Sequence, residues 1–223
     1  LPEDAYPDTD SPKEAPDEAV ELEITFEQGL PVAVDGQGMD GVALVEHLND
    51  VGGAHGVGRD IHVGDTILGI KGRVGFEAPA AEVLLTAHRE LEKLVLSKWQ
   101  QVKKDEMARF YGMLLHEGQY FDPVMRDIEA HLLSSQAAVS GTVTLELYKG
   151  GVSVLGADSP NSLFNADLAT YGEENALWNG RDAEGFTRLA GVPSLLAAAS
   201  GAGASPASPP LASITGPSVT PIS

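Results

Sequence analysis

Three basic side chains stand close together in a chain that is otherwise strongly acidic. They are Arg59, Lys71 and Arg73, three of the 14 basic residues in the protein. Arginine and lysine bind carboxylates and phosphates through charge-assisted hydrogen bonds, so this cluster suggests a site for an anionic ligand. The alternative is an internal ion-pair network with the neighbouring carboxylates Asp60, Asp65 and Glu77. The sequence alone leaves both interpretations open.

A glycine-rich segment, residues 52–58, directly precedes the cluster. Segments of this kind can bring backbone N–H groups close to a phosphate. This one lacks the Gly-Lys-Ser/Thr ending of a P-loop, and it follows an expected helix instead of a strand. The alternative to ligand contact is a helix C-cap followed by a tight backbone bend.

No other pattern indicates catalysis or metal binding. The chain has no cysteine, which excludes a disulfide framework, a thiolate nucleophile and a cysteine-ligated metal. The six histidines show no metal-ligand spacing. No serine has the glycines of a nucleophile elbow. His88 is expected to be packed or partly exposed, and Glu90 and Glu92 are expected on a solvated helix face. We therefore predict no catalytic residue, no metal ligand and no cofactor-binding residue.

The overall charge excludes two classes of partner. The 223 residues include 33 Asp and Glu against 14 Lys and Arg, a formal net charge of -19. Such a surface repels the phosphates of nucleic acids and lacks the basic clusters that bind anionic lipid. Apolar runs such as residues 83–85 are far too short to cross a bilayer. We therefore expect neither a nucleic acid nor a membrane as partner.

The two ends of the chain differ in composition from its middle. Residues 1–18 hold seven acidic residues and four prolines, which indicates an acidic linker. Residues 200–223 hold no charged residue and five prolines, which indicates a disordered tail. Residues 19–199 are left for one globular domain. Because the chain begins at Leu1 instead of methionine, we expect it to be processed or to be part of a longer protein.

Strands and helices are expected in groups instead of strict alternation. Period-two patterns predict two hairpins, formed by residues 20–26 with 31–34 and by residues 142–148 with 152–155, the second turning at Gly150-Gly151. Residues 66–71 read as a short buried strand. Helical spacing predicts helices over residues 42–53, 79–96, 97–116 and 123–136, and shorter ones over 162–169 and 183–189. This grouping favours an α+β fold over a doubly wound sheet.

Nine segments occur in an order that is typical of one family. They are residues 22–32, 48–59, 69–73, 76–80, 87–92, 140–143, 147–150, 159–164 and 183–186. Together they resemble the C-terminal domain of argininosuccinate synthase over roughly residues 4–190. Residues 58–66, followed by 97–101, look like a divergent branch familiar from Bacteroidetes-type bacteria.

The resemblance implies a sheet of antiparallel or mixed hairpins with several packed helices. It also implies a cytoplasmic ligase of arginine biosynthesis, the reaction that also serves the urea cycle. This enzyme activates the ureido oxygen of citrulline with ATP, releasing pyrophosphate, and the amine of aspartate then displaces AMP to give argininosuccinate. ATP with Mg²⁺, and most aspartate contacts, would belong to an N-terminal nucleotide-binding domain whose pyrophosphatase loop is absent here. This chain would supply citrulline contacts, build a homotetramer and be inactive alone.

Residue by residue, the resemblance places the substrate contacts between positions 59 and 77. The family has a Glu and a Tyr that contact citrulline, and Gly64 and Phe76 occupy those two positions. Asp65 can substitute for the carboxylate, and Phe76 can keep the ring packing without the hydroxyl. A changed or N-modified citrulline is another reading of the same differences. The expected substrate-binding set is therefore Arg59, Gly64, Asp65, Lys71, Arg73 and Phe76. The alternative function is a non-catalytic acidic assembly module or a carboxylate-binding module derived from that fold.

Overall fold

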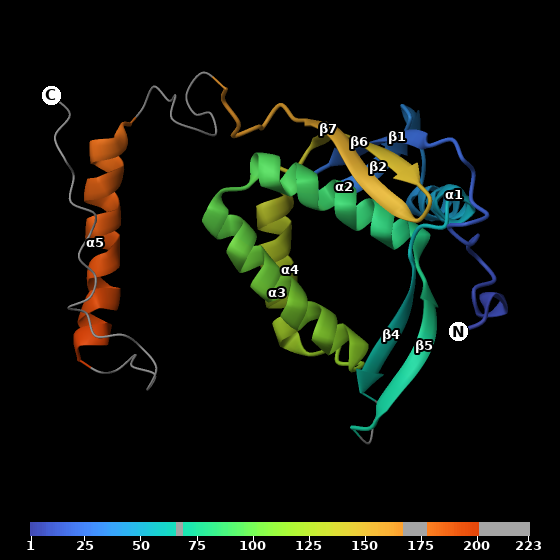
Figure 1. Ribbon diagram of the computed structural model, residues 1–223, viewed down its shortest axis with the longest axis horizontal. Helices are drawn as coiled ribbons and strands as arrows, with labels where there is room; N and C mark the ends of the chain where they lie inside the picture. Colours follow the sequence, from blue (N-terminus) through green and yellow to red (C-terminus); the bar gives the residue numbers. More distant parts are fainter. Residues whose placement is uncertain (66–68, 167–177, 201–223) are drawn as a thin grey trace, which may run out of the picture. The chain divides into compact units, whose positions relative to one another are not determined.

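The computed structural model describes residues 1–65, 69–166 and 178–200. The chain forms two compact units, Leu1–Phe164 and Asn165–Ser223, and each is described by itself. The first unit contains a sheet, four α-helices and a separate two-stranded hairpin (Figure 1). This arrangement confirms the predicted α+β class, and every strand pairing is antiparallel.

Five strands form the main sheet in the order β3-β2-β1-β6-β7. Their bounds are β1 Val20–Glu27, β2 Leu30–Val34, β3 Gln37–Gly38, β6 Gly141–Tyr148 and β7 Gly151–Asp158. Both predicted hairpins are confirmed as β1–β2 and β6–β7. The second turns at Lys149-Gly150, one residue earlier than predicted, and both of these residues have positive φ (45° and 86°). A two-residue type I′ turn requires this backbone conformation at both of its central residues.

Four helices belong to the first unit, as the spacing predicts. They are α1 Gly41–Ala54, α2 Pro79–Val95, α3 Lys98–His116 and α4 Pro123–Gln136, and a short 3-10 helix, η1, covers Glu3–Ala5. Side chains at the N-caps of three of these helices accept backbone N–H bonds, at Asp40, Ser97 and Asp122. These bonds satisfy donors that have no partner inside the helix, so they fix where each helix begins.

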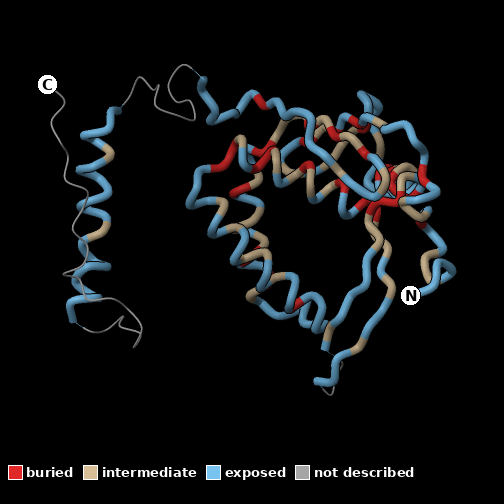
Figure 2. The backbone as a smooth tube through the Cα atoms, in the orientation of Figure 1, coloured by how far each residue is buried: buried red, intermediate tan, exposed pale blue. Residues whose placement is uncertain are grey.

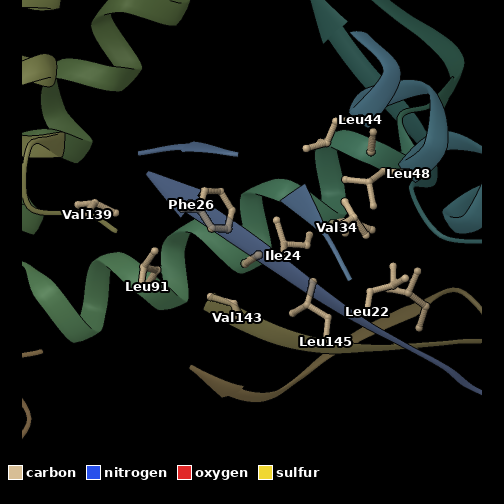
Figure 3. Close-up of a cluster of buried hydrophobic side chains, with 14 of the residues drawn as sticks. Leu22, Ile24, Phe26, Val34, Leu44, Leu48, Leu91, Val139, Val143 and Leu145 are labelled. Carbon is tan, nitrogen blue, oxygen red and sulfur yellow. The ribbon is translucent and has the colours of Figure 1, made fainter. Parts of the chain in front are cut away.

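The core lies between the sheet and helices α1 and α2. Alternate residues of β1 point into it, at Leu22, Ile24 and Phe26, while Glu21 and Glu23 face solvent. Figure 3 shows these side chains meeting leucines from α1 and α2 and valines from β2 and β6. Helices α3 and α4 instead bury a smaller cluster of their own, which contains Leu114, Met125 and Ile128. Buried residues therefore gather around the sheet, as Figure 2 shows in red.

The second unit contains α5, Gly180–Ala199. It includes the helix predicted at 183–189 and extends further in both directions. The helix predicted at 162–169 does not form over residues 162–166, and its remainder lies outside the described residues. Of the predicted tail, residues 201–223 also lie outside them. In the described ranges, no helix combines the length and apolar character that a membrane crossing requires.

The buried strand predicted at 66–71 is wrong where it can be compared. Residues 66–68 lie outside the described ones, but Ile70 is 63% exposed. Two exposed strands flank this segment instead, β4 Arg59–Asp65 and β5 Lys71–Glu77. Among the described strands they pair with each other alone, and they project from the body of the unit (Figure 1), so their apolar residues do not lie in the core.

Candidate functional site

All six residues of the predicted substrate-binding set lie on the β4–β5 hairpin. Its register pairs Arg59 with Glu77 at the root and Asp65 with Lys71 near the tip. Directly opposed residues share a face of the ribbon, and successive residues of one strand alternate between faces. The register therefore decides which predicted residues can meet the same ligand.

The predicted residues divide between the two faces. Arg59, Asp65, Lys71 and Arg73 share one face with Glu77, which we call the Arg face. Gly64 and Phe76 lie on the opposite Phe face, together with Asp60, His62 and Val74. Along the strand, Arg59 and Asp65 are six residues apart, or about 20 Å. The six residues are thus brought to one element, but they do not converge on one point.

Arg59 is engaged inside the protein. Its side chain is only 9% exposed, and Nη2 donates to Glu3 Oε2 at 2.7 Å. The guanidinium also lies 4.2 Å from the centre of the Tyr6 ring, a cation–π contact. Nη1 is buried without a hydrogen-bond partner among the described residues. Arg59 is therefore engaged within the protein, but its ion-pair partner is Glu3 and not Asp60, Asp65 or Glu77 as the alternative interpretation expected.

Near the tip, the Lys71 ammonium lies 2.7 Å from Asp65 Oδ1. Both side chains are more than half exposed, and ion pairs of this kind contribute little to stability because water screens them. Arg73 is also exposed. Asp65 thus shares its face with Lys71 and not with Phe76. A role for it in place of the carboxylate missing at Gly64 would require contact around the edge of the ribbon.

The Phe face adjoins a cavity of about 410 Å³ at the hairpin root. Asp60 and Phe76 line it together with Ala81, Glu82 and Leu85 of α2. The Phe76 ring is 52% exposed, so it is available for contact. This face offers a ring, a carboxylate and an imidazole, a set that can pack against and hydrogen-bond a polar small molecule.

His62 is the neighbour that the sequence analysis missed. A Cβ placed on Gly64 would lie 2.6 Å from His62 Nε2, so the imidazole fills the space beside the glycine. His62 precedes Gly64 by two residues, and strand alternation puts such residues on the same face. The two-residue spacing of His62 and Gly64 would have indicated this contact if residues 59–65 had been predicted as an exposed strand.

The glycine-rich segment is a helix end with close backbone packing. It covers the last turn of α1, where His55 N–H bonds Gly52 O at 3.2 Å. A Cβ on Gly53 would lie 2.5 Å from the carbonyl oxygen of Asp8. Gly58 has φ +78°, and a Cβ there would meet backbone of Ala78 and Pro79 at 2.6 Å. The glycines are thus required by neighbouring protein, which agrees with the C-cap interpretation.

The glycine-rich segment does not fit a phosphate of ATP, and the described residues contain no group that could hold Mg²⁺. In the described ranges, no group of three or more His, Asp or Glu is placed to hold a metal ion. The glycine-rich segment lies at the C-terminal end of its helix, where the helix dipole disfavours a phosphate. These residues do not fit the nucleotide, so we assign none of its chemistry to them.

A second polar cluster joins α2, α3 and α4. Glu92 is only 5% exposed, so its expected place on a solvated face is wrong. Its carboxylate accepts from Lys104 Nζ and Gln136 Nε2, both at 2.7 Å. His88 Nε2 lies 2.8 Å from Gln136 Oε1, and burial lowers the pKa of this imidazole, although the Glu92 carboxylate acts in the opposite direction. His88, Lys104 and Gln136 line an open cleft of about 890 Å³.

Comparisons with known proteins identify the family. Residues 1–197 match the family described as Arginosuccinate synthase C-terminal domain. Proteins named argininosuccinate synthase from Chlorobium limicola and Chlorobaculum parvum are each 44% identical over 191 residues, 86% of this chain. That from Chlorobium phaeobacteroides strain BS1 is 45% identical over the same length. The matches cover 48%, 47% and 47% of these relatives, so the chain spans about half their length.

Proposed function

The chain belongs to the argininosuccinate synthase C-terminal domain family, and from that premise we propose that it is the substrate-binding and assembly half of such a ligase. The complete enzyme would join citrulline, or an N-modified citrulline, to aspartate with ATP as co-substrate. ATP and Mg²⁺ would be bound by a nucleotide-binding half that is not in this chain. The chain alone would therefore carry no ligase activity.

The observation that supports this proposal most directly is the exposure of the β4–β5 hairpin beyond its root. A two-stranded ribbon alone is marginally stable in water, because it lacks a third strand or a helix against which to bury a face. Near the root, Phe76 is 52% exposed, and further out Val63 is 57% and Val74 is 55% exposed. A ribbon of this kind is suited to enter a second body and be covered there. We assign that role to the nucleotide-binding half.

On this proposal the Phe face carries the citrulline contacts. Phe76 would pack against the aliphatic part of the substrate, and His62 beside Gly64 would hydrogen-bond a polar group. At Gly64 the His62 imidazole occupies the space beside the missing glutamate side chain, so the substrate would meet an imidazole in place of a carboxylate, which is consistent with a modified citrulline. The Arg face would not contact citrulline directly at Arg59, which is engaged with Glu3 and Tyr6.

Expression of the whole reading frame that encodes this chain tests the proposal. We expect pyrophosphate release that requires ATP, aspartate and citrulline or N-acetylcitrulline, and no release from the 223-residue chain alone. Phe76→Ala in the whole protein should raise the KM for the citrulline substrate and leave the KM for ATP unchanged. Absence of ligation with every citrulline tested would contradict the proposal.

Assembly is the second part of the proposal, and helix α5 supports it. Phe186, Leu189, Val192 and Leu196 recur at helical spacing and are 73%, 75%, 41% and 66% exposed. A contiguous apolar stripe of this kind marks a protein contact. We assign the contact to other copies of the chain in a homotetramer. Light scattering should show a smaller assembly for Leu189→Glu than for Arg188→Glu, which changes a neighbouring charged side chain.

A non-catalytic module is the alternative, and the Gly64 and Phe76 positions favour it. Without the family's carboxylate and phenol, the Phe face has fewer hydrogen bonds to offer a substrate. The alternative predicts assembly without ligation. The same two measurements therefore separate it from the enzyme: light scattering would show an oligomer, while pyrophosphate release would be absent in the whole protein.

A further inference from the structure

The first nine residues bind the root of the β4–β5 hairpin on its Arg face. Glu3 and Tyr6 both contact the Arg59 guanidinium. Glu3 Oε2 lies 2.7 Å from Nη2, and the centre of the Tyr6 ring lies 4.2 Å from Cζ. Thr9 Oγ1 donates to Glu77 Oε1 at 2.6 Å. Arg59 and Glu77 are opposed across the ribbon, yet both direct these side-chain contacts to the N-terminal segment. Each strand of the hairpin is thus fastened separately.

The following residues fasten the same segment to the body of the unit. Asp10 N–H bonds Gly53 O at 2.9 Å, and the Ala15 side chain is 4% exposed. Asp17 ends this stretch with a 2.6 Å ion pair to Lys149. Residues 1–17, which we call the strap, therefore run from the hairpin to α1 and the β6–β7 turn. The composition predicts an acidic linker here, and in the structure Thr9 and Ala15 of this stretch are buried while most of its other residues are exposed.

The strap also covers the hairpin sterically. A Cβ on Gly75 would lie 3.3 Å from both Ala5 O and Leu1 Cδ1, so backbone and side chain of the strap lie directly over β5. The opposite, Phe face is left free at the same level, where Phe76 lines its cavity. One face of the root is fixed and the other stays open.

We propose that the strap positions the β4–β5 hairpin so that its Phe face meets the substrate, with Tyr6 and Thr9 as positioning residues that act through Arg59 and Glu77. This proposal rests on the function proposed above. The physical reason is that a projecting two-stranded ribbon can swing about its root. Contacts to both strands at that root remove this freedom.

Hydrogen exchange on the 223-residue chain tests the strap without any assay of activity. Tyr6→Ala removes the cation–π contact and the 3.4 Å hydrogen bond that the Tyr6 hydroxyl donates to Asp60 O. Thr9→Val removes the 2.6 Å hydrogen bond to Glu77 and keeps the side-chain shape, and it leaves the 3.1 Å bond that Asp8 N–H donates to the same oxygen. We expect the β4 and β5 amides to exchange roughly tenfold faster in each variant, the size that a buried cation–π contact or a bond to a carboxylate provides. The β1 and β6 amides should be unchanged, which shows that the core is folded.

Conservative variants supply the controls. Tyr6→Phe keeps the ring over Arg59 and loses only the long, 3.4 Å hydrogen bond from the phenol to Asp60 O. Thr9→Ser keeps a hydroxyl near Glu77, so both variants should exchange like the original. Asp17→Asn alters the exposed end of the strap furthest from the hairpin and should also leave β4 and β5 unchanged. Equal exchange of the hairpin amides in Tyr6→Ala, Thr9→Val and the original chain would overturn the proposal.

Kinetics of the whole protein then separate positioning from general stability. Tyr6→Ala should raise the KM for the citrulline substrate several-fold, with the KM for ATP unchanged and recovery in Tyr6→Phe. Faster hairpin exchange with an unchanged citrulline KM would overturn the positioning role. A whole protein without ligase activity would overturn the proposed function, while the exchange result would still decide whether the strap holds the hairpin.

Discussion

Replacing Glu92 should be among the most damaging single changes to this protein, although Glu92 is a charged residue. Glu92 is only 5% exposed, and its carboxylate accepts hydrogen bonds at 2.7 Å from Lys104 of α3 and from Gln136 of α4. Helices α3 and α4 bury their own small cluster, so this carboxylate is a principal tie between them and α2.

The magnitude follows from what the substitution leaves behind. Glu92→Leu would leave Lys104, whose side chain is 15% exposed, with only the exposed Asp105 carboxylate at 4.0 Å as its ion-pair partner. Removing one partner of a buried ion pair costs about 3–5 kcal/mol, because the other charge stays desolvated. Lys104 keeps some contact with water, so we expect the lower end, about 3 kcal/mol. A loss of that size is a large part of the roughly 5–15 kcal/mol that stabilises a typical domain.

Urea unfolding of a double-mutant cycle measures this effect. Lys104→Met should cost about as much as Glu92→Leu, since it leaves the carboxylate buried with Gln136 as its remaining close donor. The two together should cost much less than their sum, because an apolar pair of similar volume replaces the charges. Two single losses that simply add, or a loss below about 1 kcal/mol for Glu92→Leu, would refute this reasoning.

Three further predictions concern other positions. Burial lowers the pKa of His88, so the unfolded chain binds a proton at this residue before the folded chain does as the pH falls below about 6.5. The free energy of unfolding should therefore decrease over that range. The urea midpoints at pH 7.5 and pH 5.5 should differ less in His88→Gln than in the original chain. Gly53→Ala should lower the free energy of unfolding by about 1–3 kcal/mol, because its Cβ would meet the Asp8 carbonyl at 2.5 Å. The control Gly112→Ala, in open space within α3, should raise it by roughly 0.5–1 kcal/mol. Gly64→Glu in the whole protein should lower the KM for citrulline relative to that for N-acetylcitrulline, and an unchanged ratio would refute the assignment of the Phe face.

The main sheet and its helices could be predicted because their signals are local. Leu22, Ile24 and Phe26 alternate with glutamates, and Lys149-Gly150 has the chemistry of a tight turn. Capping residues such as Asp40 mark helix starts. Each of these patterns lies within a few residues of the feature that it specifies, so it can be recognised from the sequence alone.

The contacts of charged residues could not be predicted in the same way. Arg59 meets Glu3 and Tyr6 more than 50 residues earlier in the chain, and Glu92 meets Gln136 44 residues later. Both charged residues stand in polar surroundings in the sequence, which suggested a ligand for one and solvent for the other. Their burial depends on which helices and strands pack together, and the spacing of residues along the sequence does not specify that packing.

The β4–β5 hairpin is another place where sequence pattern and structure disagree. Ile61 and Val63 lie on the Arg face and Val74 and Phe76 on the Phe face, so the ribbon carries apolar residues on both sides. Strands with two apolar faces are normally covered on both. Here these four side chains are 40–57% exposed, and in the described part of the chain the strap covers only the root of one face. The pattern is therefore typical of a covered strand, and on the function proposed above the nucleotide-binding half supplies the cover.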